Sequence, residues 1–176
     1  MMVPPREPLP YPDIDVLPPH LQDAVTSRAS LNIFRMIMHT PALAPSFLTL
    51  ANDVLQQNSL PPTWRELVIL RVGFRYHCGY ELHHHLNIGR AIGVTEADIA
   101  AAESGSTESL GEEEANILRL ADLILTNHTL SAAERTAALK TLSINQLADL
   151  TLTVGFYQLV CNFLNIFGVQ PEGSPQ

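Results

Sequence analysis

Positive charge is scarce in this sequence. Its 176 residues contain 10 lysines and arginines against 18 aspartates and glutamates, which gives a formal net charge of −8 at pH 7. Proteins that bind nucleic acid or an anionic membrane need a basic surface that neutralises phosphates. We therefore expect no nucleic-acid or membrane partner, and expect a small-molecule substrate and further copies of the same chain instead.

Cysteine is rare as well, since the chain has only Cys78 and Cys161. A small secreted domain that depends on disulfides carries more cysteines than this, and these two lie far apart in helical surroundings. The N-terminus also lacks the basic region and the apolar run of a signal peptide. These features predict a reducing, cytoplasmic location.

No uninterrupted apolar run reaches the roughly 20 residues that a transmembrane helix needs. The richest stretch, residues 147–169, is broken by Asp149, Gln158, Asn162 and Asn165. We expect it to be a core or interface helix. With 46% hydrophobic residues the chain is able to bury a core, and its length is that of a single domain.

Strand patterns are missing, because no segment alternates apolar and polar residues. Apolar residues recur at helical spacing, and prolines, glycines and capping residues mark the ends of the segments. The predicted helices lie at about 31–38, 41–55, 62–74, 79–92, just after Thr95, 111–127, just after Ser131, and 144–167. The expected fold class is all-α, with the third and fourth helices as antiparallel neighbours.

Proline is concentrated at the N-terminus, where seven of the thirteen prolines fall within the first nineteen residues. We expect residues 1–27 to form an extended arm, residues 28–170 a helical domain, and residues 171–176 a tail. The second helix is expected to bury a stripe that includes Leu43 and Leu50. That stripe and the last helix carry more apolar surface than one chain of this size buries, which predicts an obligate homo-oligomer.

Most of the functional information lies between Glu66 and His85. On a helix of 3.6 residues per turn, Cys78, Glu81 and His85 fall at about 0°, 300° and 340° and share one stripe. Glu81 and His85 are four residues apart and able to hydrogen-bond directly. Gly73, on the preceding helix, would let the two helices approach closely enough for Glu66 to meet this stripe.

The charges in this stripe oppose one another. Cys78 stands at a helix start, where free N–H groups and the helix dipole stabilise a thiolate. Glu81, one turn on, disfavours a second anion unless His85 supplies a positive charge. The cluster is therefore suited to holding and moving a proton.

These residues resemble the active-site pattern Glu-x11-Cys-x-x-Cys-x3-His of the carboxymuconolactone decarboxylase and alkylhydroperoxidase D superfamily. Glu66, Cys78 and His85 match it, and Glu81 stands in place of the second cysteine. The resemblance covers roughly residues 28–170 and includes Arg65-Glu66-Leu67-Val68-Ile69-Leu70 and Phe163-Leu164-Asn165. It implies an alkylhydroperoxidase D-like helical bundle around a central antiparallel helix pair, assembled as a dimer, trimer or hexamer.

Proton transfer suits this variant better than thiol chemistry. A dithiol relay needs a resolving cysteine beside the first, and Glu81 cannot form a disulfide. Cys161 replaces it only if the last helix brings it next to Cys78. The leading hypothesis is a lyase, decarboxylase-like and without a cofactor, in which Glu66, Glu81 and His85 act as acid and base on a small carboxylated, lactone or carbonyl substrate.

Two other functions stay open. One is a thiol-dependent alkyl hydroperoxide reductase with peroxiredoxin-type activity, in which Cys78 reacts with peroxide. The other is a non-catalytic oligomeric binding module. In either of the enzymatic readings Cys78 belongs to the candidate catalytic group, and Tyr80 and His84 beside it are expected to bind substrate.

Each candidate also has a purely structural interpretation. Glu66 follows Thr63 by three residues, as in a helix capping box. Cys78 is of a type often buried as a small apolar residue, and Glu81 with His85 forms a possible surface ion pair of little energetic value. Consecutive histidines up to His85 diverge by about 100° per residue on a helix and cannot chelate a metal jointly, so no metal site is expected.

Overall fold

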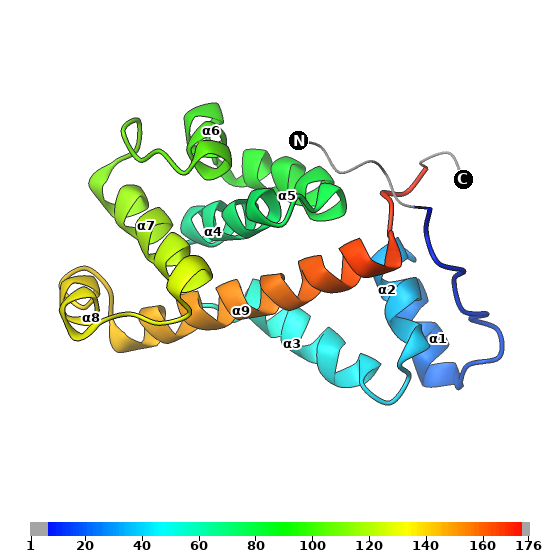
Figure 1. The fold of residues 1–176 in the computed structure, drawn as a ribbon. Coiled ribbons are helices and arrows are strands. Elements are labelled where there is room, and N and C mark those ends of the chain that lie inside the picture. Colours follow the sequence, from blue (N-terminus) through cyan, green and yellow to red (C-terminus); the bar gives the residue numbers. More distant parts are fainter. Residues whose placement is uncertain (1–6, 174–176) are drawn as a thin grey trace.

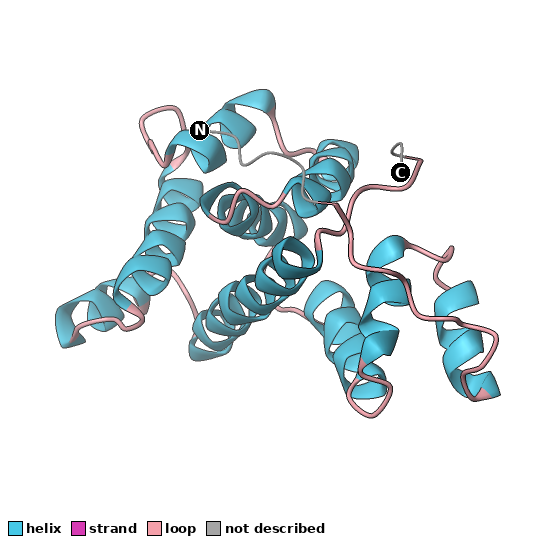
Figure 2. Ribbon diagram, turned by 45° about the vertical axis from the view of Figure 1, so that its right-hand side comes forward, coloured by secondary structure: helices cyan, strands magenta, loops and turns pink. Residues whose placement is uncertain are grey.

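Nine α-helices and one short 3-10 helix form the regular structure of residues 7–173, the part of the chain that this computed structural model describes, and no strand occurs there (Figure 2). The all-α prediction is confirmed. The elements in chain order are α1 (Pro19–Thr26), α2 (Asn32–Met36), η1 (Ile37–His39), α3 (Ala44–Gln56), α4 (Pro62–Arg75), α5 (Gly79–Ile92), α6 (Glu96–Ser104), α7 (Glu112–Asn127), α8 (Ala132–Ala138) and α9 (Ile144–Phe167).

Local capping signals explain many of these boundaries. Thr95, Ser131 and Ser143 each accept a hydrogen bond from the residue three positions later and form a full capping box at the start of α6, α8 and α9. Gly93 and Gly168 end α5 and α9 in the left-handed conformation. The predicted starts and ends of these helices are confirmed to within a residue or two.

The prediction of an extended N-terminal arm is wrong for residues 19–26, which form α1. A proline in the first turn suits a helix start, because the missing N–H would have no intrahelical partner there. Leu21 and Val25 of this helix are buried in an apolar cluster with η1 and α3. Residues 1–6 of the predicted arm and 174–176 of the predicted tail lie outside the described residues.

Helix α4 lies at the centre of the fold, in contact with α5, α6, α7 and α9 (Figure 1). A helix that is apolar around most of its circumference is buried on all sides, and α4 has this character from Leu67 to Gly73. Arg71 on this helix is also buried. Its guanidinium binds the Asp122 carboxylate of α7 at 2.8 and 3.1 Å and the Ala102 carbonyl of α6 at 2.9 Å. This network ties α4 to both neighbours.

Two glycines let α4 and α5 approach each other. A Cβ atom at Gly73 would lie 3.1 Å from the Leu82 side chain and 3.9 Å from Cβ of Glu81. A Cβ atom at Gly89 would lie 3.3 Å from the Val94 side chain and 3.8 Å from Cβ of Glu66. The close approach expected at Gly73 is confirmed, and Gly89 provides a second one near the opposite end of the pair.

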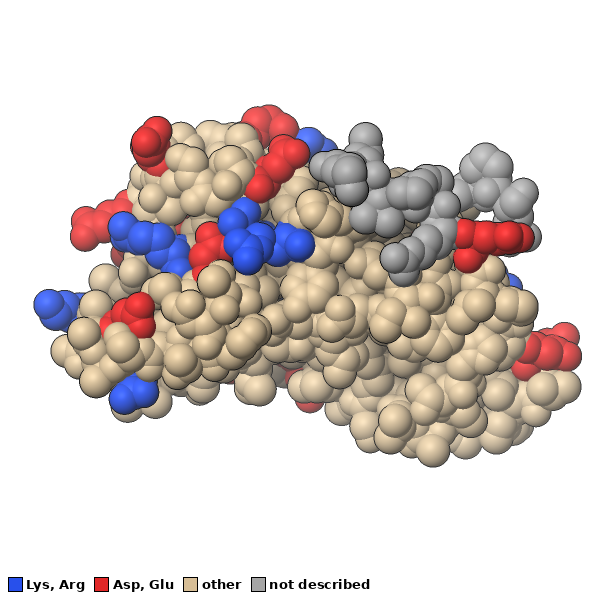
Figure 3. Space-filling model, in the orientation of Figure 1, with Lys and Arg blue, Asp and Glu red and all other residues tan. Residues whose placement is uncertain are grey.

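The outer face of α9 remains apolar and exposed. Leu152, Leu159 and Ile166 recur every seven residues and are 59%, 52% and 67% exposed. Leu43 and Leu50, expected to be buried, are also exposed, because α3 packs through Ala44 and Leu48 on its other side. Figure 3 shows that charged side chains on this face gather over α6 and α7 and leave the surface over α9 largely uncharged.

Among the described residues, α9 is the one helix long and apolar enough to cross a membrane by length and composition. Core helices of soluble proteins pass the same test, and 44% of the apolar window of α9 is buried inside this fold. Residues such as Leu150, Val154 and Leu164 pack in the main apolar cluster. The interpretation of α9 as a core helix with one free face agrees with this packing.

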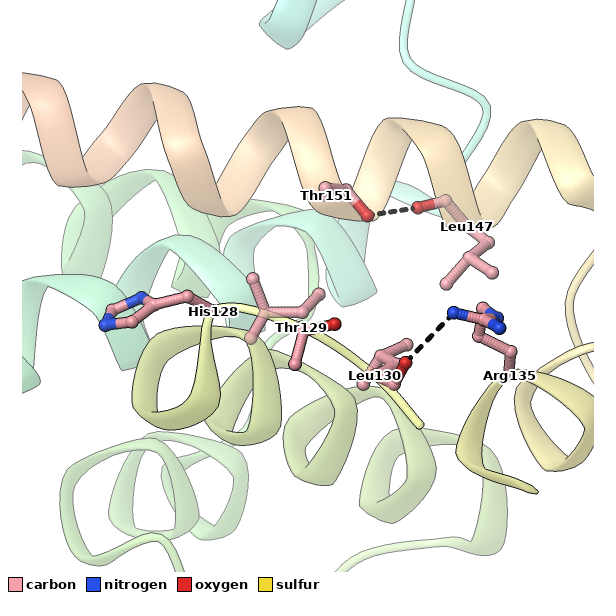
Figure 4. A pocket seen from close by; sticks show the side chains of 7 residues that line it. His128, Thr129, Leu130, Arg135, Leu147 and Thr151 are labelled. Carbon is pink, nitrogen blue, oxygen red and sulfur yellow. Dashed lines mark hydrogen bonds between the residues drawn. The ribbon is translucent and has the colours of Figure 1, made fainter. Parts of the chain in front are cut away.

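A shallow hollow of about 200 Å³ lies between the end of α7, the start of α8 and the first turns of α9 (Figure 4). Leu147 and Thr151 form one wall, and Leu130 and Arg135 face them. The Arg135 guanidinium donates to the Leu130 carbonyl at 3.1 Å. No residue of the Glu66–His85 segment lines this hollow.

Candidate active site

His85 is held between two carboxylates. Its Nδ1 lies 2.7 Å from Oε2 of Glu66 on α4, and its Nε2 lies 3.2 Å from Oε2 of Glu81, one turn earlier on α5. The antiparallel crossing at Gly89 brings Glu66 to this point. The structure therefore unites the three residues that the sequence predicts to act as one unit.

The surroundings of His85 favour its charged form. Burial is the largest single influence and lowers the pKa of His85, but the hydrogen bonds from Glu66 and Glu81 and their charges outweigh it. The pKa of His85 rises to about 9. The imidazole is thus protonated at neutral pH, with both ring nitrogens donating to carboxylates.

Exposure differs among the members of this unit. Glu66 is 0% exposed, whereas Glu81 and His85 retain 5% and 6%. Glu66 Oε1 has no hydrogen-bond partner among the described residues, and the nearest charged group is Arg65 Nε at 3.7 Å. A reactant that approaches from solvent would reach Glu81 and His85 before Glu66.

Cys78 occupies the sharp junction between α4 and α5. Its N–H donates to the Gly73 carbonyl at 2.9 Å, and the His77 N–H donates to the Phe74 carbonyl at 3.1 Å. These are the two hydrogen bonds of a Schellman ending, with His77 in the left-handed conformation at φ 48°. The junction fixes Cys78 as the N-cap of α5, and its side chain is fully buried.

Helix α9 adds two residues that the sequence interpretation did not assign to the site. The Tyr157 hydroxyl lies 3.3 Å from Nε2 of His85, and the two rings meet edge to face at 5.2 Å. Burial, followed by the charges of Glu81 and Glu66, raises the pKa of Tyr157 well above its ordinary value. Tyr157 therefore stays a neutral hydroxyl beside the imidazolium.

Cys161, one turn after Tyr157, lies near Cys78. Both belong to the main apolar cluster, and the neighbouring Cys78 thiol, followed by burial and the charge of Glu81, raises the pKa of Cys161. Both cysteines are free and buried. Their spacing of four puts Tyr157 and Cys161 on one face of the long last helix, but the sequence does not show that this face is the buried one.

Tyr80 and His84, the predicted substrate-binding residues, contact the C-terminal segment instead. The Tyr80 hydroxyl donates to Oε1 of Glu172 at 2.8 Å, and Nε2 of His84 lies 2.9 Å from Oε2 of the same carboxylate. The Asn32 N–H donates to it as well, at 2.6 Å. These contacts tie Glu172 to α2 and α5.

The purely structural interpretations of Glu66, Cys78, Glu81 and His85 have different outcomes. Pro61, not Thr63, is the N-cap of α4, so the capping role proposed for Glu66 is wrong. Glu81 and His85 form a buried pair and not a surface one. Cys78 is indeed buried, in the same apolar cluster as Cys161. Across residues 7–173, no group of three or more His, Cys, Asp or Glu side chains is placed to hold a metal ion.

Comparison with known proteins shows what this arrangement is similar to. Residues 41–123, which include α4 and α5, match the Carboxymuconolactone decarboxylase family. A comparison with curated proteins gives no match. The family match covers Glu66, Cys78, Glu81 and His85 and leaves out α9.

Solved structures with the same fold include the alkylhydroperoxidase AhpD core of a peroxidase-related protein from Ralstonia eutropha JMP134. It has a TM-score of 0.82 and 16% sequence identity, over 94% of this chain and 92% of that chain. A peroxidase-related protein from Silicibacter sp. TM1040 has a TM-score of 0.78 and 18% identity, over 98% and 96%. The debrominase Bmp8, in complex with 2,3,4-tribromopyrrole, has a TM-score of 0.70 and 17% identity, over 94% and 90%. At these identities the likeness establishes the alkylhydroperoxidase D-like fold and nothing finer.

Proposed function

We propose that this chain, whose residues 41–123 match the carboxymuconolactone decarboxylase family, is a lyase-type enzyme that moves protons on a small carbonyl, lactone or carboxylated substrate. The observation that carries the proposal is the charged His85 between Glu66 and Glu81, at 2.7 and 3.2 Å. A buried group of this kind offers a base and an acid side by side near neutral pH.

The three residues differ in their roles. Glu66 is fully buried and binds Nδ1, so it is a positioning residue that orients the ring and keeps it charged. We assign Glu81 as the base, because it keeps a small exposed fraction whereas Glu66 has none. We assign His85 as the acid, because its Nε2 lies beside the Glu81 carboxylate at 3.2 Å.

The expected step is proton exchange at carbon. Glu81 takes a proton from the carbon next to a carbonyl group, the electron pair moves into the carbonyl, and His85 stabilises the developing oxyanion by its Nε2–H. In a decarboxylation the C–C bond to the leaving carboxylate breaks instead, and the carbanion equivalent receives its proton from His85. Tyr157 is the neutral donor next to Nε2 in either case.

Several observations support an enzyme over a binding module. Fold relatives are named as peroxidase-related proteins and a debrominase. Burying three ionisable side chains in a helical core destabilises a fold unless they are fully paired, and Glu66 Oε1 lacks a hydrogen bond within residues 7–173. A costly cluster of this kind is more readily explained by a catalytic role than by a structural one. Two buried free thiols agree with a reducing, cytoplasmic location, which we include in the proposal.

Hydrogen–deuterium exchange at carbon tests the proposal directly. The full chain is incubated in heavy water with a panel of small β-keto acids, lactones and ketones, and exchange and CO₂ release are followed by NMR. Glu81→Gln and His85→Gln should each lower turnover by about 10² to 10⁴. The double variant should lose little more, because residues of one unit are not additive.

His83→Gln is the matched control, since His83 lies on the same helix but is exposed. It should keep full turnover, and the melting temperature of every variant is measured alongside. The joint acid–base unit is wrong if the loss of turnover in the double variant equals the product of the two single losses. It is also wrong if turnover falls only in proportion to the loss of folded protein. A triple Glu66, Glu81 and His85 replacement that leaves ligand binding unchanged would favour the binding module.

A further inference from the structure

The hollow of about 200 Å³ between the end of α7, the start of α8 and the first turns of α9 lies outside the acid–base site (Figure 4). None of Glu66, Glu81 and His85 lines it, and the chemistry proposed above gives it no role. An engineered cavity of about 150 Å³ holds one benzene molecule. The hollow therefore has room for one ring or a short acyl chain.

Apolar side chains form most of the walls of the hollow. Ile124 comes from α7, Leu130 from the segment before α8 and Leu147 from α9, and each is half-buried. All three pack against the main apolar cluster, which holds them in place. Thr151 adds no free hydroxyl proton, because its Oγ1 donates to the Leu147 carbonyl at 2.8 Å. A ligand that displaces water from these walls must therefore have an apolar body.

One end of the hollow carries a positive charge without a counter-ion. Arg135 donates to the Leu130 carbonyl at 3.1 Å, which holds its guanidinium at the rim (Figure 4). This hydrogen bond uses one of the five N–H donors of the group. Among the described residues no carboxylate forms an ion pair with Arg135. The adjacent Glu134 is engaged in a capping box, where it accepts from the Ser131 N–H at 2.6 Å.

We propose that this hollow is a binding site for a small organic carboxylate whose apolar body is one ring or a short acyl chain. The carboxylate accepts two hydrogen bonds from the Arg135 guanidinium, whose planar fork matches its two oxygens. The body lies against the apolar walls, where it displaces water. His128 lines the other end of the hollow in Figure 4, so Arg135 alone recognises the carboxylate.

NMR titration of the isotope-labelled full chain at constant ionic strength tests the site. The probes are benzoate and hexanoate, and we expect saturable shifts of the Leu147 and Thr151 amide signals. Acetate and inorganic phosphate lack the apolar body, and benzamide lacks the charge. Each of these three should bind about tenfold more weakly or worse, because the burial of a ring and a charge-assisted hydrogen bond are each worth about that factor.

Two variants of Arg135 separate its charge from its shape. Arg135→Gln removes both the charge and the fork, and should raise the Kd of benzoate about tenfold or more. Arg135→Lys keeps the charge but loses the fork, and should give a smaller increase. Arg119→Gln is the matched control and should leave the Kd unchanged, because Arg119 is also exposed, lies on α7 and does not line the hollow.

Several results would overturn the proposal. One is the absence of saturable binding of benzoate or hexanoate to the wild type. Another is equal affinity for benzoate, acetate and phosphate, which would mean attraction by charge only. An equal rise in Kd for Arg135→Gln and Arg119→Gln, or shifts confined to Glu81 and His85, would exclude this hollow as the site. The readout is binding and not turnover, so failure of the exchange assay does not bear on this result.

Discussion

The charge on His85 should make the stability of the protein fall between pH 6.5 and about 9, and Glu66→Gln should weaken that dependence. The pKa of His85 in the folded state is about 9, above the 6.5 of an unperturbed histidine. A group whose pKa is raised on folding contributes its full stabilisation below the unfolded value. That contribution is lost as the pH rises through the folded value.

The size of the effect follows from the same two pKa values. The interval from 6.5 to about 9, at 1.36 kcal/mol per pH unit, corresponds to roughly 3 kcal/mol of pH-dependent stability. His85 is almost completely buried, so solvent screening reduces this figure little. Glu66→Gln removes the charge at 2.7 Å from Nδ1 and leaves burial opposed by Glu81 alone. The loss of stability between these pH values should then be smaller by about 1.4 kcal/mol or more, which corresponds to one unit of the His85 pKa.

Urea unfolding of wild type and Glu66→Gln from about pH 6 to 10 measures this dependence, at one fixed protein concentration because association changes apparent stability. NMR titration of the His85 ring gives its pKa directly. His83→Gln is the control, because it removes an exposed imidazole from the same helix. If Glu66→Gln retains the full pH dependence, or if His85 titrates near 6.5, the proposed charge distribution is incorrect.

Two further predictions concern packing. Gly89→Val should lower the free energy of unfolding by about 1 to 3 kcal/mol and lower the pKa of His85, because the added side chain presses on Val94 and Glu66. Gly79→Val is the matched control in urea unfolding, because a Cβ atom there meets nothing within 4 Å. The wild type should sediment as a homo-oligomer and Leu159→Glu as a smaller species, because the exposed stripe of α9 is apolar and uncharged. Leu139→Glu, at the exposed C-cap of α8, should leave the assembly intact. A monomeric wild type at micromolar concentration would remove this last expectation.

The features that the sequence predicted well are those with local causes. Capping residues such as Thr95 and Ser131 define helix starts within a few positions. The spacing of four between Glu81 and His85 fixes their contact on any helix. Glu66 required one further inference, that a small residue permits close helix packing, and Gly73 supplied it.

The features that the sequence did not reveal depend on how distant elements pack. Tyr157 and Cys161 lie on a helix without charged residues beyond Asp149, so its apolar pattern does not distinguish the buried face from the free one. At the α4–α5 junction the positive φ falls on His77, a residue with a side chain, and not on the nearby Gly79. The Schellman hydrogen bonds favour that position strongly enough to accept a residue with a side chain.

Glu81, which stands in place of a second cysteine, affects which groups of the site stay protonated. Its charge helps to raise the pKa of three neighbours, His85, Tyr157 and Cys161, so all three hold their protons at neutral pH. A neutral thiol at position 81 would give none of them this stabilisation. The site therefore presents several proton donors around the Glu81 carboxylate, which is buried but not completely so. Such an arrangement favours a transition state in which negative charge builds up on a substrate oxygen, as in enolisation or decarboxylation, because the donors are in place before the charge forms.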